Sequence, residues 1–90
     1  MNTAEFETSA RGDGYEIVPR DMTAGFANPD HQHPFDARGL VTAGEMTITV
    51  DAVATLYRAG DIFTVSAGRV HREAAGPEGV KYIAGRRHVS

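Results

Sequence analysis

The sequence contains no cysteine, and this absence limits the chemistry open to the chain. There can be no disulfide framework and no thiolate ligand, so any bound metal must be held by nitrogen and oxygen atoms. No run of apolar residues approaches the roughly 18 that a membrane-spanning helix needs. The first residues lack the basic and apolar regions of a signal peptide. We therefore expect a protein without membrane segments that works in the cytoplasm.

Positive charge is also scarce. Nine lysines and arginines face 12 aspartates and glutamates, so the net charge is −3 and the isoelectric point is near 5.7. A nucleic-acid-binding protein normally carries a basic patch, and we expect no nucleic-acid partner here. Hydrophobic residues make up 41% of the 90 residues, which is ordinary for one folded domain with a modest core. Chains of this size often gain stability from a second subunit, and we expect a homodimer.

The first 14 residues predict a short helix followed by a turn. Asn2 or Thr3 can cap the helix, and Phe6 and Ala10 form an apolar pair one turn apart. Gly12 can take the left-handed position that ends a helix. A helix of this length is not stable alone, so we expect it to dock on the rest of the chain through Phe6.

From residue 15 onward the pattern is that of short β-strands. Met46, Ile48 and Val50 alternate with threonines, which predicts one buried and one polar face, and Asp51-Ala52 is a tight turn after them. Expected turns lie at 28–30, 43–45, 67–68 and 76–79, and a polar tail begins at residue 85. About eight short strands with such spacing are typical of an antiparallel sandwich or barrel. The expected strands are 15–18, 22–26, 39–43, 46–50, 53–57, 62–65, 70–74 and 80–84.

Two histidines, His31 and His33, lie two residues apart. On an extended strand such residues point to the same face, so both imidazoles could bind one metal ion. His71 lies far along the chain, after a glycine-containing turn. Two close histidines and one distant histidine predict a three-histidine metal site.

The spacing around these histidines is specific. Gly25 is followed by five residues and then by the His31-Gln32-His33 triplet, and this first pattern closes on Gly44. The second pattern runs from Gly60 through five residues to Ser66-Ala67-Gly68, and after two more residues it reaches His71.

Both patterns, in this order, resemble the two motifs of the small single-domain cupins over about residues 25–84. The resemblance implies an all-β fold, a single jelly-roll barrel of two antiparallel sheets, so that residues 1–90 form one cupin domain with a short N-terminal helix. It also implies a divalent metal in the barrel mouth, with His31, His33 and His71 as ligands. The fourth ligand of the motif, a glutamate, is missing, because Ala37 and Arg38 occupy the two allowed positions. Ser66 and Ala75 also stand where the second motif has proline and asparagine.

Three candidates remain for completing the metal shell. Glu73 shares the strand face of His71 if that strand is regular, and it could be the fourth ligand, a partner of an imidazole or a general base. An exposed glutamate without a role is an equal alternative. Asp36 is close to His33 but points to the opposite face unless a bulge intervenes, and water is the third candidate. His88 lies in the polar tail and is expected at the surface.

The residues leave the metal and the reaction open. Three imidazoles can bind zinc, iron, manganese, nickel or copper. The resemblance implies a small-molecule ligand and suggests oxygenase-like or isomerase-like chemistry. A non-catalytic module that binds a small ligand or senses metal is an alternative, as is a degenerate barrel without metal. Phe35, Met46, Ile48, Val50 and Phe63 are expected to line the barrel interior.

Overall fold

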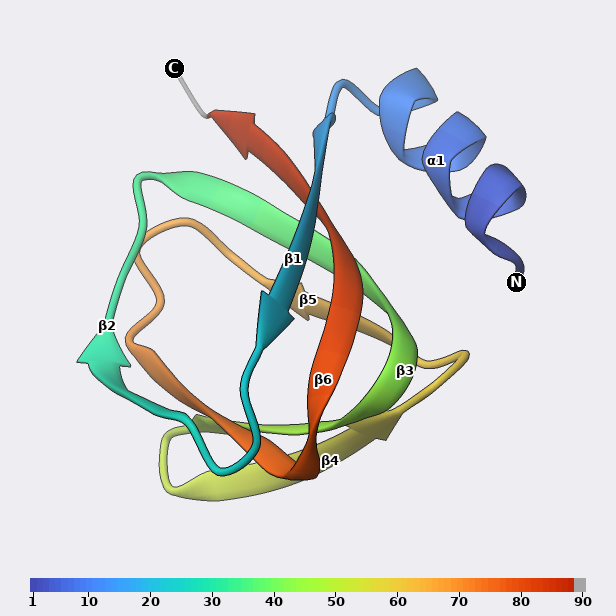
Figure 1. Ribbon diagram of the computed structural model, residues 1–90. Coiled ribbons are helices and arrows are strands. Elements are labelled where there is room, and N and C mark those ends of the chain that lie inside the picture. The colour runs from blue at the N-terminus through green and yellow to red at the C-terminus, as the bar shows by residue number, and fades with distance from the viewer. Residues whose placement is uncertain (89–90) are drawn as a thin grey trace.

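Two long, bent strands organise the structure, a computed structural model that describes residues 1–88. The strands β3 and β6 are antiparallel partners along most of their length, and the other four strands add to their edges. The order along the sheet is β1-β6-β3-β4, while β2 also pairs with β6 and β5 with β3. The sheet curls into a jelly-roll barrel (Figure 1). The elements are α1 (Thr3–Gly12), β1 (Glu16–Met22), β2 (Ala27–His31), β3 (Phe35–Val50), β4 (Val53–Arg58), β5 (Ile62–Val65) and β6 (His71–His88).

The predicted all-β fold with a short N-terminal helix is confirmed, with one difference in the count of sheets. The two expected sheets are joined, because β3 and β6 pass through both layers and keep hydrogen bonds to partners in each. All six strands therefore belong to one continuous antiparallel sheet.

Several expected turns are instead bends inside the two long strands. The predicted strands 39–43 and 46–50 are both part of β3. Residues 71–74 and 80–84 and the tail to residue 88 are all part of β6, and Val70 of the predicted strand 70–74 lies just before it. Met46 pairs with Ala75 and Gly44 with Val80, so residues 76–79 form a bulge rather than a turn that ends the strand. Gly44 has a φ of +73°, and a side chain there would collide with the carbonyl oxygen of Gly79. Glycine allows the two backbones to cross closely enough for pairing to continue.

The region before the first histidine also differs from the prediction. Residues 23–25 form a turn rather than part of a strand, and the Gly25 amide donates to the carbonyl of Gly76. The predicted turn at 28–30 lies inside β2, where Asn28 pairs with Glu73 of β6. Pairing with β6 overrides the local preference of an Asn-Pro-Asp sequence for a turn.

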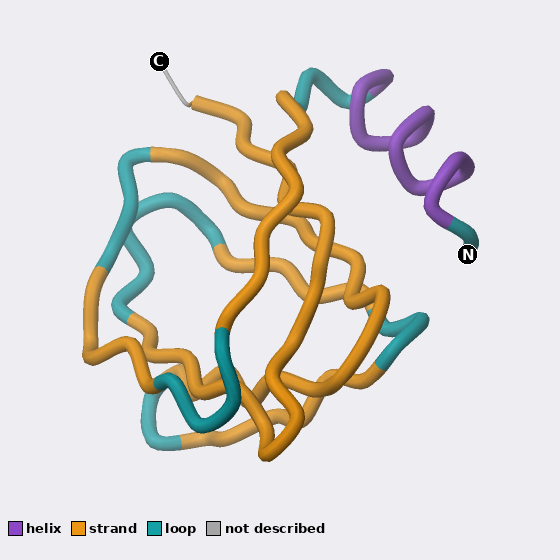
Figure 2. The backbone as a smooth tube through the Cα atoms, viewed as in Figure 1, coloured by secondary structure: helices purple, strands orange, loops and turns teal. Residues whose placement is uncertain are grey.

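The helix α1 lies outside the barrel, against β1 and β3 (Figure 2). Asn2 caps it, and the side chain of Glu5 reaches back to the Asn2 amide. Phe6 and Ala10 are fully buried in a small cluster with Tyr15 and Leu40, as docking through Phe6 predicted. The predicted role of Gly12 is wrong, because Gly12 is the last helical residue and the left-handed φ of +88° belongs to Gly14.

The barrel interior is filled by apolar side chains, as the alternation in the sequence predicted. Met46, Ile48 and Phe63 are buried, and Val50 packs against them in part. Their cluster continues into Val41, Val65, Ala75, Val80 and Tyr82. The two-residue turn after β3 is confirmed, and Asp51 and Ala52 both have positive φ angles, of 50° and 65°. No helix among residues 1–88 is long and apolar enough to cross a membrane.

Candidate metal centre

Three histidines meet where β2 pairs with the start of β6. His31 and His71 are directly opposite each other, so their side chains share one face, and their ring centres are 4.2 Å apart. His33 follows the end of β2 rather than continuing that strand, and its carbonyl oxygen accepts a hydrogen bond from the Gly68 amide. The His33 ring centre is 4.8 Å from that of His31 and 5.2 Å from that of His71. One nitrogen from each ring lies within 4.8 Å of the others, close enough for all three to bind one metal ion.

Backbone carbonyls set the ring tautomers of His31 and His71. The Nδ1 atom of His31 lies 2.7 Å from the carbonyl oxygen of Pro29, and that of His71 lies 2.9 Å from the carbonyl oxygen of Arg69. A carbonyl oxygen only accepts hydrogen bonds, so each Nδ1 must carry the proton and donate it. In the neutral rings, Nε2 then has a free lone pair, which is the form that a metal ligand requires.

Glu73 lies beside this lone pair. Its side chain is 12% exposed, and its Oε1 atom lies 3.3 Å from Nε2 of His31 and accepts a 3.0 Å hydrogen bond from Nδ2 of Asn28. The contact with Nε2 lacks hydrogen-bond geometry, and within residues 1–88 this nitrogen is the one buried side-chain polar atom without a partner. A lone pair and a carboxylate that face each other repel unless a cation or a proton lies between them. The residues present therefore fit a bound cation.

His33 is held in place by an aromatic neighbour. Its ring stacks on that of Phe35, with centres 4.6 Å apart and planes 11° from parallel. Burial lowers the pKa of His33 below its ordinary value, and the nearby imidazoles of His31 and His71 lower it further. At neutral pH the His33 ring is therefore uncharged and able to donate a lone pair to a metal.

The histidines open into a cavity of about 160 Å³. Ala37 lines it, which places the position of the missing motif glutamate at the same cavity, but a methyl group offers no ligand atom. The other lining residues combine apolar side chains with a few polar ones: Arg20, Met22, Asn28, Phe35, Phe63, Val65, Glu73, Tyr82, Ala84, Gly85 and Arg86.

Asp36 is committed elsewhere. Its Oδ1 atom accepts a 2.9 Å hydrogen bond from the Ala67 amide, and its Oδ2 atom accepts a 3.0 Å bond from Nη2 of Arg87. These two contacts, the amide first, lower the pKa of Asp36. The carboxylate thus ties β3 and β6 to the loop after β5 and stays outside the cluster, on the face that strand alternation predicted. His88 is exposed, as expected, and its ring lies 5.4 Å from that of Phe35 rather than among the three histidines.

The site contains residues that the sequence patterns did not reveal. Asn28 orients Glu73, and Arg20, Tyr82 and Arg86 reach the cavity from β1 and the far half of β6. Only the strand register brings them together, because Arg20 pairs with Tyr82 across 62 positions of sequence. A local motif carries no signal for such a contact.

Comparison with solved structures supports this architecture. A cupin superfamily protein from Desulfitobacterium hafniense is 21% identical, with a TM-score of 0.74 over 83% of this chain and 68% of its own. An RmlC-like cupin from Shewanella frigidimarina is 27% identical, with a TM-score of 0.70 over 83% and 67%. KdgF from a Halomonas species is 19% identical, with a TM-score of 0.69 over 84% and 71%. Among curated proteins, none shows significant similarity to this sequence.

The sequence itself matches the cupin domain family over residues 20–84. The matched region begins within β1, contains all three clustered histidines and Glu73, and ends within β6. With a barrel of the same kind and its histidines together at one end of β2 and β6, this chain belongs to the cupin domain family.

Proposed function

We propose that the chain binds one divalent transition metal through the Nε2 atoms of His31 and His71 and a ring nitrogen of His33. The observation that carries the proposal is the unpartnered Nε2 atom of His31, which is buried beside the carboxylate of Glu73. A positive ion between them would satisfy both groups. Zinc, iron, manganese, nickel and copper all accept this donor set.

Glu73 has one of two roles in this proposal. It is either the fourth ligand, in place of the glutamate that Ala37 replaces, or a general base next to the metal. The hydrogen bond from Asn28 leaves its second carboxylate oxygen available in both cases. A carboxylate bound directly to the metal would also reduce the net charge of the site and favour a divalent cation.

The proposed activity is oxygenase-like or isomerase-like chemistry on a small molecule. A bound divalent ion supplies a Lewis acid that polarises an oxygen of the substrate. In this proposal the apolar side chains of the cavity accommodate a small carbon skeleton, and Glu73, which lies 3.3 Å from Nε2 of His31, would accept a proton.

The test is a metal titration of purified, metal-free protein by calorimetry. We expect one zinc ion per chain, and we expect the double variant His31→Ala with His33→Ala to lose binding. The matched control is His88→Ala, which removes an exposed histidine outside the cluster and should bind zinc like the wild type. A wild-type chain that binds no metal, or a double variant that binds as well as the wild type, would contradict the proposal.

We also propose that the protein is a homodimer in the cytoplasm. The strands β1 and β4 lie at the ends of the main strand path, and unpaired strand edges are usually covered in stable proteins. Val53 and Leu56 on β4 are 65% and 45% exposed, which adds apolar surface next to one of these edges. Light scattering at micromolar concentration should give the mass of two chains, and a purely monomeric mass would refute the dimer.

A further inference from the structure

Two arginines enter the histidine cavity without a carboxylate partner. Arg20 lies on β1 and Arg86 on β6, and both line the cavity that the three histidines share with Glu73. Within residues 1–88, neither guanidinium lies within ion-pair distance of an acidic side chain. Glu16 is the strand partner of Arg86 across β1 and β6, but its carboxylate forms no ion pair with Arg86.

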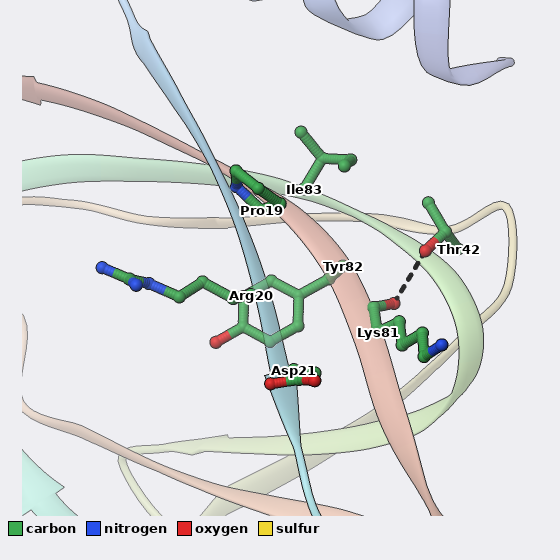
Figure 3. A pocket seen from close by; sticks show the side chains of 7 residues that line it. All are labelled: Pro19, Arg20, Asp21, Thr42, Lys81, Tyr82 and Ile83. Atoms are coloured by element: carbon green, nitrogen blue, oxygen red, sulfur yellow. Dashed lines mark hydrogen bonds between the residues drawn. The ribbon is translucent and has the colours of Figure 1, made fainter.

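Both arginines lie on the inner face of the sheet. Arg20 pairs with Tyr82, and residues 80, 82, 84 and 86 of β6 alternate with outward-facing ones. Tyr82 belongs to the interior cluster, which places its neighbours Arg20 and Arg86 on the same side. Figure 3 shows Arg20 and the hydroxyl end of Tyr82 directed to one side of β1 and β6, while the side chains of Lys81 and Ile83 lie on the other. The hollow drawn in that figure shares Arg20 and Tyr82 with the histidine cavity.

Arg86 is held next to the metal position. Its guanidinium carbon lies 5.1 Å from the ring centre of Phe35, and the Phe35 ring stacks on His33. This contact gives the positive charge a defined position despite its partial exposure. Burial raises the pKa of Tyr82, so its hydroxyl is protonated and able to donate a hydrogen bond. The cavity thus holds two guanidinium groups and the Tyr82 hydroxyl, with a single carboxylate.

We propose that this cavity binds a small organic carboxylate, whose charged group is held by Arg20 and Arg86 beside the metal position. Guanidinium groups bind carboxylates through paired hydrogen bonds, and charge-assisted bonds of this kind are the stronger ones. The apolar side chains of Phe35, Phe63 and Val65 need a carbon skeleton against them, which inorganic phosphate does not provide. The volume of about 160 Å³ is below the 300–1,000 Å³ or so of drug-sized sites and suits a molecule of a few carbons.

The ligand would make two contacts, one between its carboxylate and the arginines and one between an oxygen atom and the metal. Only the contact with the metal rests on the proposed function. The arginine contact is a separate claim. In the metal-free protein the same carboxylate should bind more weakly, but still through the arginines. The two claims can therefore fail independently.

The experiment measures succinate binding to the full chain by calorimetry, with and without bound zinc. Succinamide is the uncharged probe of the same shape, and inorganic phosphate is the anion without a carbon skeleton. Loss of a hydrogen bond to a charged group typically weakens binding about tenfold to a hundredfold, which sets the effect expected for Arg86→Gln and for Arg20→Gln. Arg72→Gln is the matched control, because Arg72 lies on β6, is exposed and does not line the cavity. It should change succinate affinity less than about twofold.

The affinities for succinate, succinamide and phosphate test the carboxylate site. The proposal stands if succinate binds at least tenfold more tightly than succinamide and phosphate, and if both cavity arginines are needed. It is overturned if succinate does not bind, if the arginine variants bind like the wild type, or if phosphate binds equally well. Arg86→Lys keeps the positive charge but not the paired hydrogen bonds of a guanidinium group. It should lose less succinate affinity than Arg86→Gln, and this comparison controls for a folding defect in the glutamine variant. If zinc fails to bind, the metal proposal falls, and the titration without zinc still tests the arginines.

Discussion

Replacing Glu73 by glutamine should have opposite effects on metal binding and on the stability of the metal-free protein. The change keeps the size and shape of the side chain and removes its negative charge. In the structure this charge faces the lone pair of His31 Nε2 at 3.3 Å, without a hydrogen bond between them. A cation would be attracted by both groups, whereas the metal-free protein must hold two acceptors against each other.

For metal binding, Glu73→Gln should weaken zinc affinity at least tenfold. Removing even an outer partner of a metal ligand commonly costs about 10–100-fold in affinity, or about 1.4–2.8 kcal/mol. Glu73 lies 3.3 Å from Nε2 of His31, a proposed ligand atom, and its side chain is only 12% exposed, so solvent screens its charge little. We therefore expect zinc affinity to fall at least tenfold, the lower end of that range.

For the metal-free protein, Glu73→Gln should raise the melting temperature. The glutamine amide carries no net charge, so the repulsion between the carboxylate and the lone pair of His31 Nε2 is removed. A gain of about 1 kcal/mol in the free energy of unfolding would correspond to about 4–8 °C in a domain of this size.

The assay combines competition with a chelator and thermal unfolding at pH 7.5, with and without zinc. Glu78→Gln is the control, because Glu78 is an exposed glutamate in the bulge of the same strand. It should change neither quantity. A variant at Glu73 that keeps wild-type zinc affinity would show that Glu73 is no ligand. A lower melting temperature without metal would refute the argument that the two acceptors repel.

Four further predictions test the histidine site and the contacts around it. Ala37→Glu should tighten zinc binding about tenfold in the same competition assay, because it adds a carboxylate to the cavity. Ala37→Gln, which adds no charge, should not tighten it. Equal zinc affinities for the two variants would refute this prediction. Zinc should raise the melting temperature at pH 7.5 and much less at pH 5, because ligation needs neutral imidazoles; equal rises would count against histidine ligands. Without metal, the free energy of unfolding should also decrease as the pH falls below about 6.5. Burial lowers the pKa of His33 in the folded chain, so below that pH the unfolded chain binds more protons than the folded chain. Asp36→Asn should lower the free energy of unfolding at pH 7 but not near pH 2. The pKa of Asp36 is lowered in the folded chain, so its ionised form stabilises the fold above the unfolded-state pKa of about 3.9, and this stabilisation is lost on acidification. Denaturant unfolding at both pH values checks this.

The sequence predicted the fold class and the histidine cluster because both depend on local signals. The alternation of Met46, Ile48 and Val50 and the spacing of the histidines are readable within short segments. The lengths of β3 and β6 were not predictable in this way. Gly44 resembles a turn residue in sequence, and only its partner across the sheet shows that the strand continues past it.

The polar surroundings of the histidines depended still more on tertiary structure. Glu73 was a candidate because it lies two residues from His71, but its hydrogen bond to Asn28 follows from the pairing of β2 with β6. Arg20 lies between two of the expected strands, 15–18 and 22–26, and Arg86 lies in the expected polar tail. Their shared cavity arises from a register that no local pattern encodes.

The carbonyl contacts at Nδ1 of His31 and His71 have a consequence for how a metal would be exchanged. The chain itself orients both rings, through carbonyl oxygens that lie two residues before them. Classical zinc fingers, in contrast, fold only when the ion arrives. A barrel with its own apolar core would not need the proposed ion in order to fold, so the bound metal would depend on which metals are available. Under this arrangement, the same chain purified from differently supplemented cultures would carry different ions in an unchanged protein shell.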